Sequence, residues 1–177
     1  MTAIVGIETD GRVLLGADSA VTWGDTLVTC KQPKVWTIGD IVIGVAGDSR
    51  ACDVVRYYLI KMKQFDGIDA AAWAARELAS AFKAAMKEVG QSDNSCDMIL
   101  GVGTKLLGID ENGGVVAFSE RYGAIGAGSP YALGSLYATD TSMTLSPRNR
   151  MVTALEAAAL YCPSVRGPWV FAPAEYP

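Results

Sequence analysis

Residues 41–46 read Ile-Val-Ile-Gly-Val-Ala, so every position in this segment is apolar or glycine. A strand with one face in water alternates between apolar and polar residues, whereas a continuous apolar run is typical of a strand covered on both faces. A sheet with two covered faces needs a further layer on each side, usually helices. This segment therefore predicts a layered α+β protein.

Turn residues and hydrophobic spacing divide the rest of the chain into strands and helices. Asp10-Gly11 and Gly39-Asp40 each separate two apolar runs, which predicts one hairpin over residues 3–17 and another over 35–46. The other predicted strands are short apolar runs bounded by turn residues: 98–103, 106–109, 115–119, 124–128 and 169–172. The predicted helices have apolar residues at helical spacing or follow a Ser-Pro pair: 49–62, 69–89, a helix starting at Ser129 as its N-cap, and 151–162 after Ser146-Pro147.

Neither a linker nor an internal repeat interrupts this order of strands, two helices, strands and two helices. Domains commonly contain about 100–200 residues, so a chain of this length fits one domain. We therefore predict that residues 1–177 form a single domain with a four-layer αββα sandwich, in which two stacked sheets lie between two layers of helices.

The chain contains no histidine. This excludes Ser-His-Asp and Cys-His triads, HExxH zinc sites and proton transfer by imidazole. Four cysteines are scattered without a CxxC pair: Cys30, Cys52, Cys96 and Cys162. We expect them to be reduced thiols of a cytoplasmic protein, and we expect no metal site and no cofactor.

Charge and hydropathy exclude two further kinds of partner. Lys and Arg number 15 against 19 Asp and Glu, and no basic run is present, which argues against nucleic-acid binding. The N-terminus lacks the basic start and apolar stretch of a signal peptide, and no apolar run reaches the roughly 18–20 residues that span a bilayer. We expect no membrane partner.

One acid–base group suited to neutral pH is left, an α-amino group with a pKa of about 7.7–8.0. A small residue such as Thr2 after the initiator methionine normally allows that methionine to be removed. Thr2 would then carry nucleophile and base together, because its hydroxyl can attack a carbonyl while its own amine takes the proton.

Asp18 and Lys34 are the two charged residues that the predicted strands bring toward Thr2. Asp18 follows the second strand of the first hairpin, and Lys34 directly precedes another strand. The ammonium group of Lys34 would disfavour protonation of the neighbouring amine and stabilise negative charge on the hydroxyl oxygen, while Asp18 would orient the lysine. An ordinary surface ion pair is the alternative interpretation.

Five stretches of the chain follow one another in a characteristic order: Thr2-Ala-Ile-Val, Gly-Ala-Asp-Ser-Ala-Val-Thr-Trp-Gly-Asp-Thr at 16–26, Lys34-Val35, Gly-Val-Ala-Gly-Asp at 44–48, and Ile-Gly-Ala-Gly-Ser-Pro-Tyr-Ala-Leu at 125–133. Together they resemble the proteasome β-type peptidases, and within these N-terminal nucleophile hydrolases the HslV-like peptidases most of all. The resemblance covers nearly the whole chain.

The resemblance implies the αββα fold and hydrolysis of peptide bonds by Thr2, supported by Asp18 and Lys34. It also implies that the backbone N–H of Gly44 stabilises the oxyanion, a position where glycine allows close approach of the main chain. The implied substrate-binding residues are Val21, Thr22, Gln32, Trp36, Val42 and Ala46. Of these, Thr22 and Ala46 would offer main-chain hydrogen bonds to an extended peptide.

The resemblance further implies a homo-oligomeric ring, stacked as a double ring. Its substrates would be peptides or unfolded proteins, and a separate ATPase that unfolds proteins is a further expected partner. The C-terminal residues 167–173 are unlike the ending expected for the family, which bears on how such an ATPase would dock.

Two positions depart from the family pattern. Ala127 stands where a serine is expected near the nucleophile, which leaves Ser129 as the candidate hydroxyl, and the last helix offers Leu160 or Cys162 where a carboxylate is expected. The carbonyl of Cys162 falls where the family can hold a cation, although the sequence gives no support for Na⁺ or Mg²⁺ there. These departures make a ring subunit that keeps the fold without the activity the main alternative. An amidase acting on a small molecule is a third interpretation, for which the sequence offers no positive feature.

Overall fold

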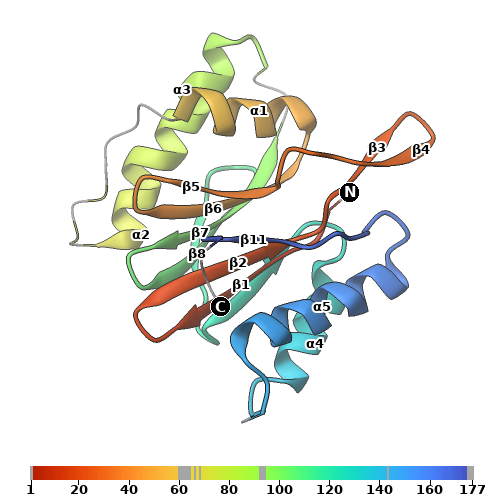
Figure 1. Ribbon diagram of the computed structural model, residues 1–177. Coiled ribbons are helices and arrows are strands. Elements are labelled where there is room, and N and C mark those ends of the chain that lie inside the picture. Colours follow the sequence, from red (N-terminus) through yellow and green to blue (C-terminus); the bar gives the residue numbers. More distant parts are fainter. Residues whose placement is uncertain are drawn as a thin grey trace.

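The computed structural model describes residues 2–59, 65, 67, 69–91, 95–142 and 144–174. Two antiparallel sheets lie face to face at its centre (Figure 1). The four-stranded sheet has the order β10 (Tyr122–Ile125), β1 (Ile4–Thr9), β2 (Arg12–Ala17), β11 (Val170–Ala172). The five-stranded sheet has the order β5 (Val35–Ile38), β6 (Ile41–Gly47), β7 (Cys96–Val102), β8 (Lys105–Ile109), β9 (Val115–Ala117).

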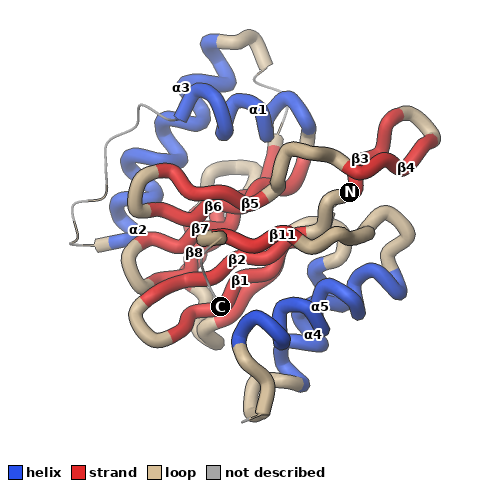
Figure 2. Tube along the Cα trace, in the orientation of Figure 1, coloured by secondary structure: helices blue, strands red, loops and turns tan. Residues whose placement is uncertain are grey.

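Helices cover the outer face of each sheet, which completes the four layers (Figure 2). The five-stranded sheet packs against α1 (Ser49–Tyr58) and against a continuous helical run made of α2 (Ala70–Trp73), the π-helical η2 (Ala74–Ala79) and α3 (Ser80–Glu88). The four-stranded sheet packs against α4 (Ser129–Ala138) and α5 (Pro147–Tyr161). The predicted αββα sandwich is confirmed.

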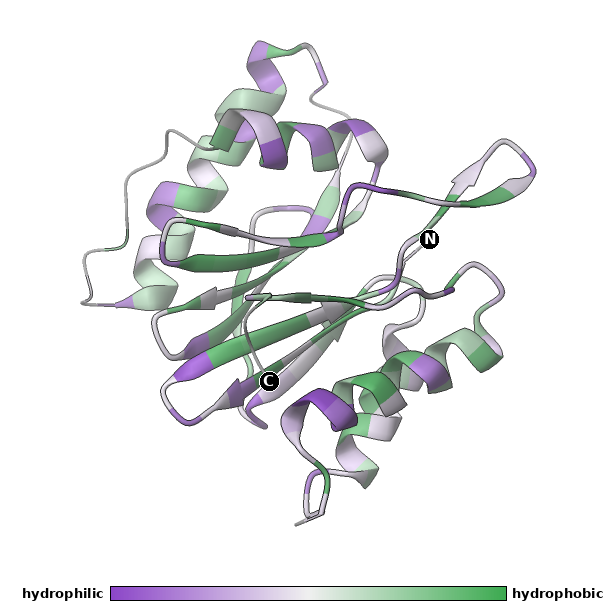
Figure 3. Cartoon of the chain, viewed as in Figure 1, coloured by the Kyte–Doolittle hydropathy of each residue, from purple (hydrophilic) through white to green (hydrophobic). Residues whose placement is uncertain are grey.

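Three buried apolar clusters hold these layers together. One lies under α1 and α3, one lies under α4 and α5, and the third lies between the two sheets, where Ile4, Leu15 and Ile99 are fully buried. The hydropathy colouring shows the same division, with hydrophobic residues in the strands and on the inner sides of the helices (Figure 3). Strand β6 is covered on both of its faces, because Ile43 packs toward the helices and Ala46 packs toward the other sheet.

Several boundaries differ from the prediction. Asp69, predicted as the first residue of the helix over 69–89, is instead its N-cap and accepts hydrogen bonds from the backbone of Ala71 and Ala72. Helix α1 ends at Tyr58, and the rest of the helix predicted for 49–62 includes residues 60–62, which lie outside the described residues. The prediction of Ser129 as an N-cap is wrong: Gly128 occupies the cap position, and Ser129 is already the first helical residue.

A separate two-stranded hairpin, β3 (Ala20–Trp23) and β4 (Thr26–Thr29), projects from the sandwich near the N-terminus (Figure 1). The side chain of Trp23 in this hairpin is 78% exposed. Within the described ranges, no helix combines the length and the apolar character needed to cross a membrane.

Candidate active site

The carboxylate of Asp18 lies at the centre of the site, where several hydrogen-bond donors converge on it. It lies just beyond β2 and is completely buried. Its oxygens accept hydrogen bonds from the backbone N–H of Ala3 at 3.0 Å and of Ala20 at 3.1 Å, and from Lys34 Nζ at 2.8 Å. Burying a charge is costly unless it is paired and hydrogen-bonded, and these three donors meet that requirement.

Lys34 connects this carboxylate to the hydroxyl of Thr2. Its ammonium group, on a side chain only 11% exposed, donates to Thr2 Oγ1 at 2.9 Å and to Asp18 Oδ1 at 2.8 Å. The sequence-based expectation that Thr2, Asp18 and Lys34 lie together therefore matches the geometry. A positive charge this close to a hydroxyl oxygen stabilises negative charge that develops on it.

The register of the β5–β6 hairpin decides which backbone N–H groups of β6 face this site. Ile38 pairs with Ile41 across the two-residue turn, and Val45 N donates to Lys34 O at 3.1 Å. Because donors alternate along a strand, odd-numbered residues of β6 direct their N–H groups toward β5 and even-numbered ones toward β7.

Gly44 therefore directs its N–H toward Ile99 of β7, its ladder partner, and not toward Thr2. The structure thus differs from the expectation of an oxyanion donor at Gly44. Gly47 has the other parity and lies two residues beyond Val45, which pairs with Lys34, so its N–H points away from β7. The turn Gly39-Asp40 fixes this parity, so the sequence alone could have shown which backbone N–H groups of β6 face β5.

Comparison with known proteins agrees with this arrangement. The family model described as proteasome subunit matches residues 2–157. The chain belongs to the proteasome subunit family. Two curated relatives are named ATP-dependent protease subunit HslV. That of Treponema denticola is 29% identical over 164 residues (91% of this chain, 89% of the relative), and that of Borrelia recurrentis is 30% identical over 173 residues (91% and 90%).

Solved structures share the fold over almost the full length. Thiobacillus denitrificans BPH in complex with epoxomicin superimposes with a TM-score of 0.84 at 22% identity, covering 96% of both chains. HslV from Trypanosoma brucei superimposes with a TM-score of 0.74 at 20% identity, covering 96% of this chain and 97% of that one. The predicted family and fold are both confirmed.

The six expected substrate-binding residues of this proteasome-family chain separate into two groups. Val21 and Thr22 lie on the projecting strand β3, directly after the segment that holds Asp18. Ala46 lies beside Thr2, because a Cβ on Gly126 would be 3.3 Å from Ala46 Cβ and 2.4 Å from Thr2 O. That these three residues border a bound peptide stays a prediction.

The other three residues have different surroundings. Val42 packs in the cluster between the sheets, four residues and about 13 Å along β6 from Ala46. Trp36 packs toward the helix layer, with the guanidinium of Arg56 4.0 Å above its ring. Gln32 is exposed, and its Oε1 lies 3.5 Å from Cys30 Sγ. No contact seen in the described part of the chain joins them to Thr2.

Ser129 and Cys162 stand at the expected hydroxyl and cation positions. Ser129 is half-buried, and among the described residues its side chain makes no hydrogen bond to Thr2. Cys162 Sγ lies 3.5 Å from the hydroxyl of the buried Ser164, and Cys162 O accepts from Val165 N at 3.0 Å. The described residues contain no cluster of acidic or cysteine side chains that could hold a metal ion.

Sequence reasoning missed Ser19, which ties the Asp18 segment to the C-terminal part of the chain. Ser19 N donates to Arg166 O at 3.1 Å, and its hydroxyl donates to Pro168 O at 2.6 Å. No local pattern indicates this contact, because 149 positions separate Ser19 from Pro168.

Two thiols near the site remain protonated at neutral pH. Burial raises the pKa of Cys52 from 9.0 to about 11, and the carboxylates of Asp48 and Asp53 add to the effect. Burial also raises the pKa of Cys96, with Cys52 as a further cause. All four cysteines are free thiols. The raised values make Cys52 and Cys96 poor nucleophiles, since the thiolate is the reactive form.

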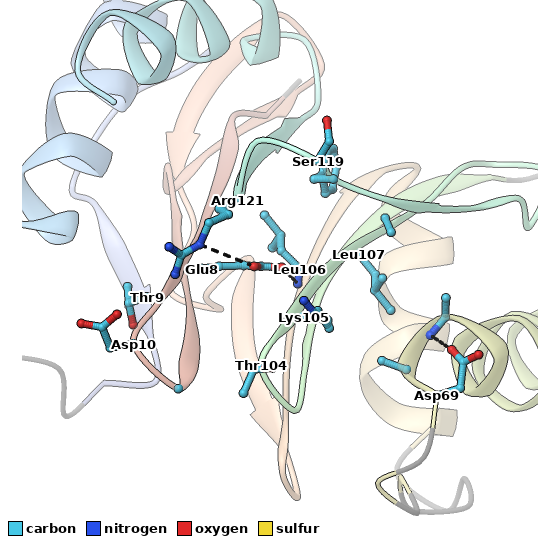
Figure 4. A pocket seen from close by; sticks show the side chains of 15 residues that line it. Glu8, Thr9, Asp10, Asp69, Thr104, Lys105, Leu106, Leu107, Ser119 and Arg121 are labelled. Atoms are coloured by element: carbon cyan, nitrogen blue, oxygen red, sulfur yellow. Dashed lines mark hydrogen bonds and ion pairs between the residues drawn. The ribbon is translucent and has the colours of Figure 1, made fainter. Parts of the chain in front are cut away.

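A cavity of about 1030 Å³ lies at the opposite end of β1 from Thr2, next to the turn at Asp10-Gly11 (Figure 4). On its wall Glu8 Oε1 accepts from Leu106 N at 2.7 Å, and Arg121 Nε lies 3.9 Å from Glu8 Oε2. The six residues of β1 place this cavity about 20 Å from the Lys34–Thr2 contact. The cavity is therefore separate from the candidate active site.

Proposed function

We propose that this chain is a threonine-type endopeptidase subunit in which removal of Met1 exposes Thr2 as the nucleophile. The observation that carries the proposal is the 2.9 Å hydrogen bond from Lys34 Nζ to Thr2 Oγ1, backed by the buried Asp18 carboxylate. Since the chain has no histidine, the α-amine of Thr2 is the group best suited to accept the hydroxyl proton at neutral pH.

In the proposed reaction Thr2 Oγ1 attacks the carbonyl carbon of the scissile peptide bond, and the hydroxyl proton passes to the α-amine. The resulting ammonium returns that proton to the leaving nitrogen as the C–N bond breaks, which leaves an ester on Thr2. Water then attacks the ester with the amine again as base, releasing the acid product and restoring the hydroxyl. Lys34 stabilises the negative charge on Oγ1, and Asp18 holds the lysine in place.

We assign the oxyanion donor to the N–H of Gly47. The strand parity described above supports Gly47 in place of Gly44. Removing one such donor costs on the order of 10²–10³ in rate in a well-studied protease, so this position matters for catalysis. A peptide that lies extended between β3 and the end of β6 would present its carbonyl to Thr2 and to Gly47 together, with main-chain hydrogen bonds as in strand addition.

We further propose that the subunit assembles with copies of itself into a ring, stacked as a double ring, and works with an ATPase that supplies unfolded protein. The names of the relatives, ATP-dependent protease subunits, support the ATPase. Exposed apolar side chains on the outer helices support self-assembly: Tyr131, Tyr137, Leu160 and Tyr161. Sedimentation velocity tests the self-assembly, since a monomer in solution would contradict it.

The free thiols support a location in a reducing compartment, the cytoplasm.

Hydrolysis of fluorogenic peptides by the wild type and by Thr2→Ala tests the peptidase assignment. Alanine also permits removal of Met1, so the two proteins share the same maturation and differ in the hydroxyl. We expect Thr2→Ala to abolish hydrolysis, Thr2→Ser to retain part of it, and Thr104→Ala, in an exposed turn, to match the wild type. Hydrolysis that survives Thr2→Ala would refute the assignment.

An inactive ring subunit is the second candidate. Ala127 and the absence of a carboxylate at Leu160 or Cys162 favour it, because these positions remove polar support near the nucleophile. The intact contacts among Thr2, Lys34 and Asp18 favour the enzyme. A correctly processed wild type that hydrolyses no peptide and forms no adduct with epoxomicin would establish the inactive subunit.

A further inference from the structure

Two glycines in the turn between β10 and α4 enclose the carbonyl oxygen of Thr2. Gly128 N donates a hydrogen bond to Thr2 O at 3.1 Å. Gly126 has φ +86, and a Cβ built on it would lie 2.4 Å from Thr2 O and 2.9 Å from Thr2 C. The absence of a side chain at Gly126 therefore allows the carbonyl to sit where Gly128 can reach it.

The contact at Gly126 is with backbone, so no side chain can turn aside to make room. An ordinary contact of a Cβ atom begins near 3.4 Å, which means that any L-residue here would push the Thr2 carbonyl away by about 1 Å. The left-handed backbone of Gly126 adds a second, independent restriction. The two effects can be separated by comparison with a glycine that has a similar φ but no atoms near the position of its Cβ.

The peptide unit joining Thr2 to Ala3 is held at both of its polar atoms. Its carbonyl oxygen accepts from Gly128 N, and its N–H, which belongs to Ala3, donates to the Asp18 carboxylate at 3.0 Å. A peptide unit is a rigid plane, so these two bonds fix the direction from which the Cα of Thr2 projects. The hydroxyl and the amine of Thr2 are both attached to that Cα.

We propose that Gly126 and Gly128 are positioning residues that act as a clamp on the Thr2–Ala3 peptide plane and thereby hold Thr2 Oγ1 at its 2.9 Å contact with Lys34. This role rests on the proposed function of Thr2 as nucleophile. Because a displacement of about 1 Å at a reacting group can cost about 100-fold in rate, the clamp has a measurable consequence.

Gly11 provides a matched control for Gly126. Its φ of +80 is close to that of Gly126, and a Cβ on it would have nothing within 4 Å. Gly11→Ala and Gly126→Ala therefore impose the same kind of backbone strain, and only the second brings a Cβ against Thr2. We expect a larger fall in melting temperature for Gly126→Ala than for Gly11→Ala, because the contact with the Thr2 backbone adds to the strain that both variants share.

The experiment measures kcat and KM for a fluorogenic peptide, with crystal structures of both variants. For Gly126→Ala we expect kcat to fall about 100-fold with KM within about threefold of the wild type, and the distance from Lys34 Nζ to Thr2 Oγ1 to lengthen by about 1 Å. For Gly11→Ala we expect kcat within about twofold of the wild type. Equal kcat values for the two variants, or an unchanged distance in Gly126→Ala, would overturn the clamp.

The structural readout separates this proposal from the proposed function. A wild type without Thr2-dependent hydrolysis would refute the peptidase, while the Lys34–Thr2 distance in Gly126→Ala would still test the clamp. If Gly126→Ala does not fold, Gly126→Asn and Gly11→Asn repeat the comparison, because asparagine accepts a left-handed backbone more readily and keeps the Cβ. Failure of both Gly126 variants to fold, with both Gly11 variants folded, would assign Gly126 to folding and overturn the proposal.

Discussion

Lys34 donates a hydrogen bond of 2.9 Å to the hydroxyl of Thr2 across 32 positions of sequence. The same ammonium group lies 2.8 Å from the carboxylate of Asp18, which is completely buried. One cation therefore serves two purposes. It compensates a buried negative charge that the fold contains, and it faces the oxygen on which a second negative charge would develop.

Replacing Lys34 by alanine should damage activity and stability together. The variant loses the positive charge beside Thr2 Oγ1, so we expect kcat/KM to fall by on the order of 10² or more. It also leaves the Asp18 carboxylate buried without its counter-ion, which should lower the free energy of unfolding by about 3 kcal/mol, since two backbone N–H groups still bind it.

Peptide hydrolysis and urea unfolding measure these two effects. Lys34→Arg keeps a charge near Asp18 with a different shape, so it should recover more stability than activity. Lys87→Ala, at an exposed position on α3, serves as the control and should change neither. Full activity in Lys34→Ala would contradict the role of the ammonium group.

A covalent complex with a peptide aldehyde should show which backbone N–H faces the oxyanion. Addition of Thr2 Oγ1 to the aldehyde gives a tetrahedral carbon whose oxygen mimics the oxyanion. In a crystal structure of this complex we expect that oxygen at about 3 Å from Gly47 N. An oxygen bound instead by Gly44 N would show that the strand parity has been misinterpreted.

The thiols of Cys52 and Cys96 should resist alkylation while the protein is folded. Burial raises the pKa of Cys52 by about two units to about 11, so at pH 8 its thiolate fraction is roughly 100-fold lower in the folded than in the unfolded chain. Mass spectrometry after iodoacetamide treatment, with and without urea, measures the difference. Equal rates in the two conditions would contradict the burial of these thiols.

The same shift implies a direction for stability at high pH. The folded state favours the neutral thiol of Cys52, so the folded chain binds more protons than the unfolded chain between pH 9 and about 11. This contribution to stability is present below pH 9 and is lost as the pH rises through about 11. Urea unfolding at pH 8 and at pH 11, compared between the wild type and Cys52→Ala, should show the loss in the wild type.

The layers of the fold follow from local features of the sequence. The run at 41–46 required two covered faces, and the turn Gly39-Asp40 set the hairpin that β5 and β6 form. The separate hairpin of β3 and β4 was not predicted, because whether a strand joins a sheet or leaves it depends on distant neighbours. That residues 1–177 form one domain stays a prediction.

Within the site, Thr2, Asp18 and Lys34 could be brought together from strand order alone. Gly44 was assigned from the resemblance to the family. The direction of its N–H depends on the register, which supports our proposal of Gly47 instead. The glycine clamp on Thr2 had no local signal, since it arises where β10 pairs with β1 across more than 100 positions.

In the proposed reaction the α-amine of Thr2 is free and acts as the base. Intact-mass measurement with N-terminal sequencing, made on a preparation whose peptide hydrolysis has been quantified, tests it most directly. We expect a chain lighter by one methionine residue that begins with Thr2, and activity that rises in proportion to this species. Full hydrolytic activity in a chain that still carries Met1 would contradict it.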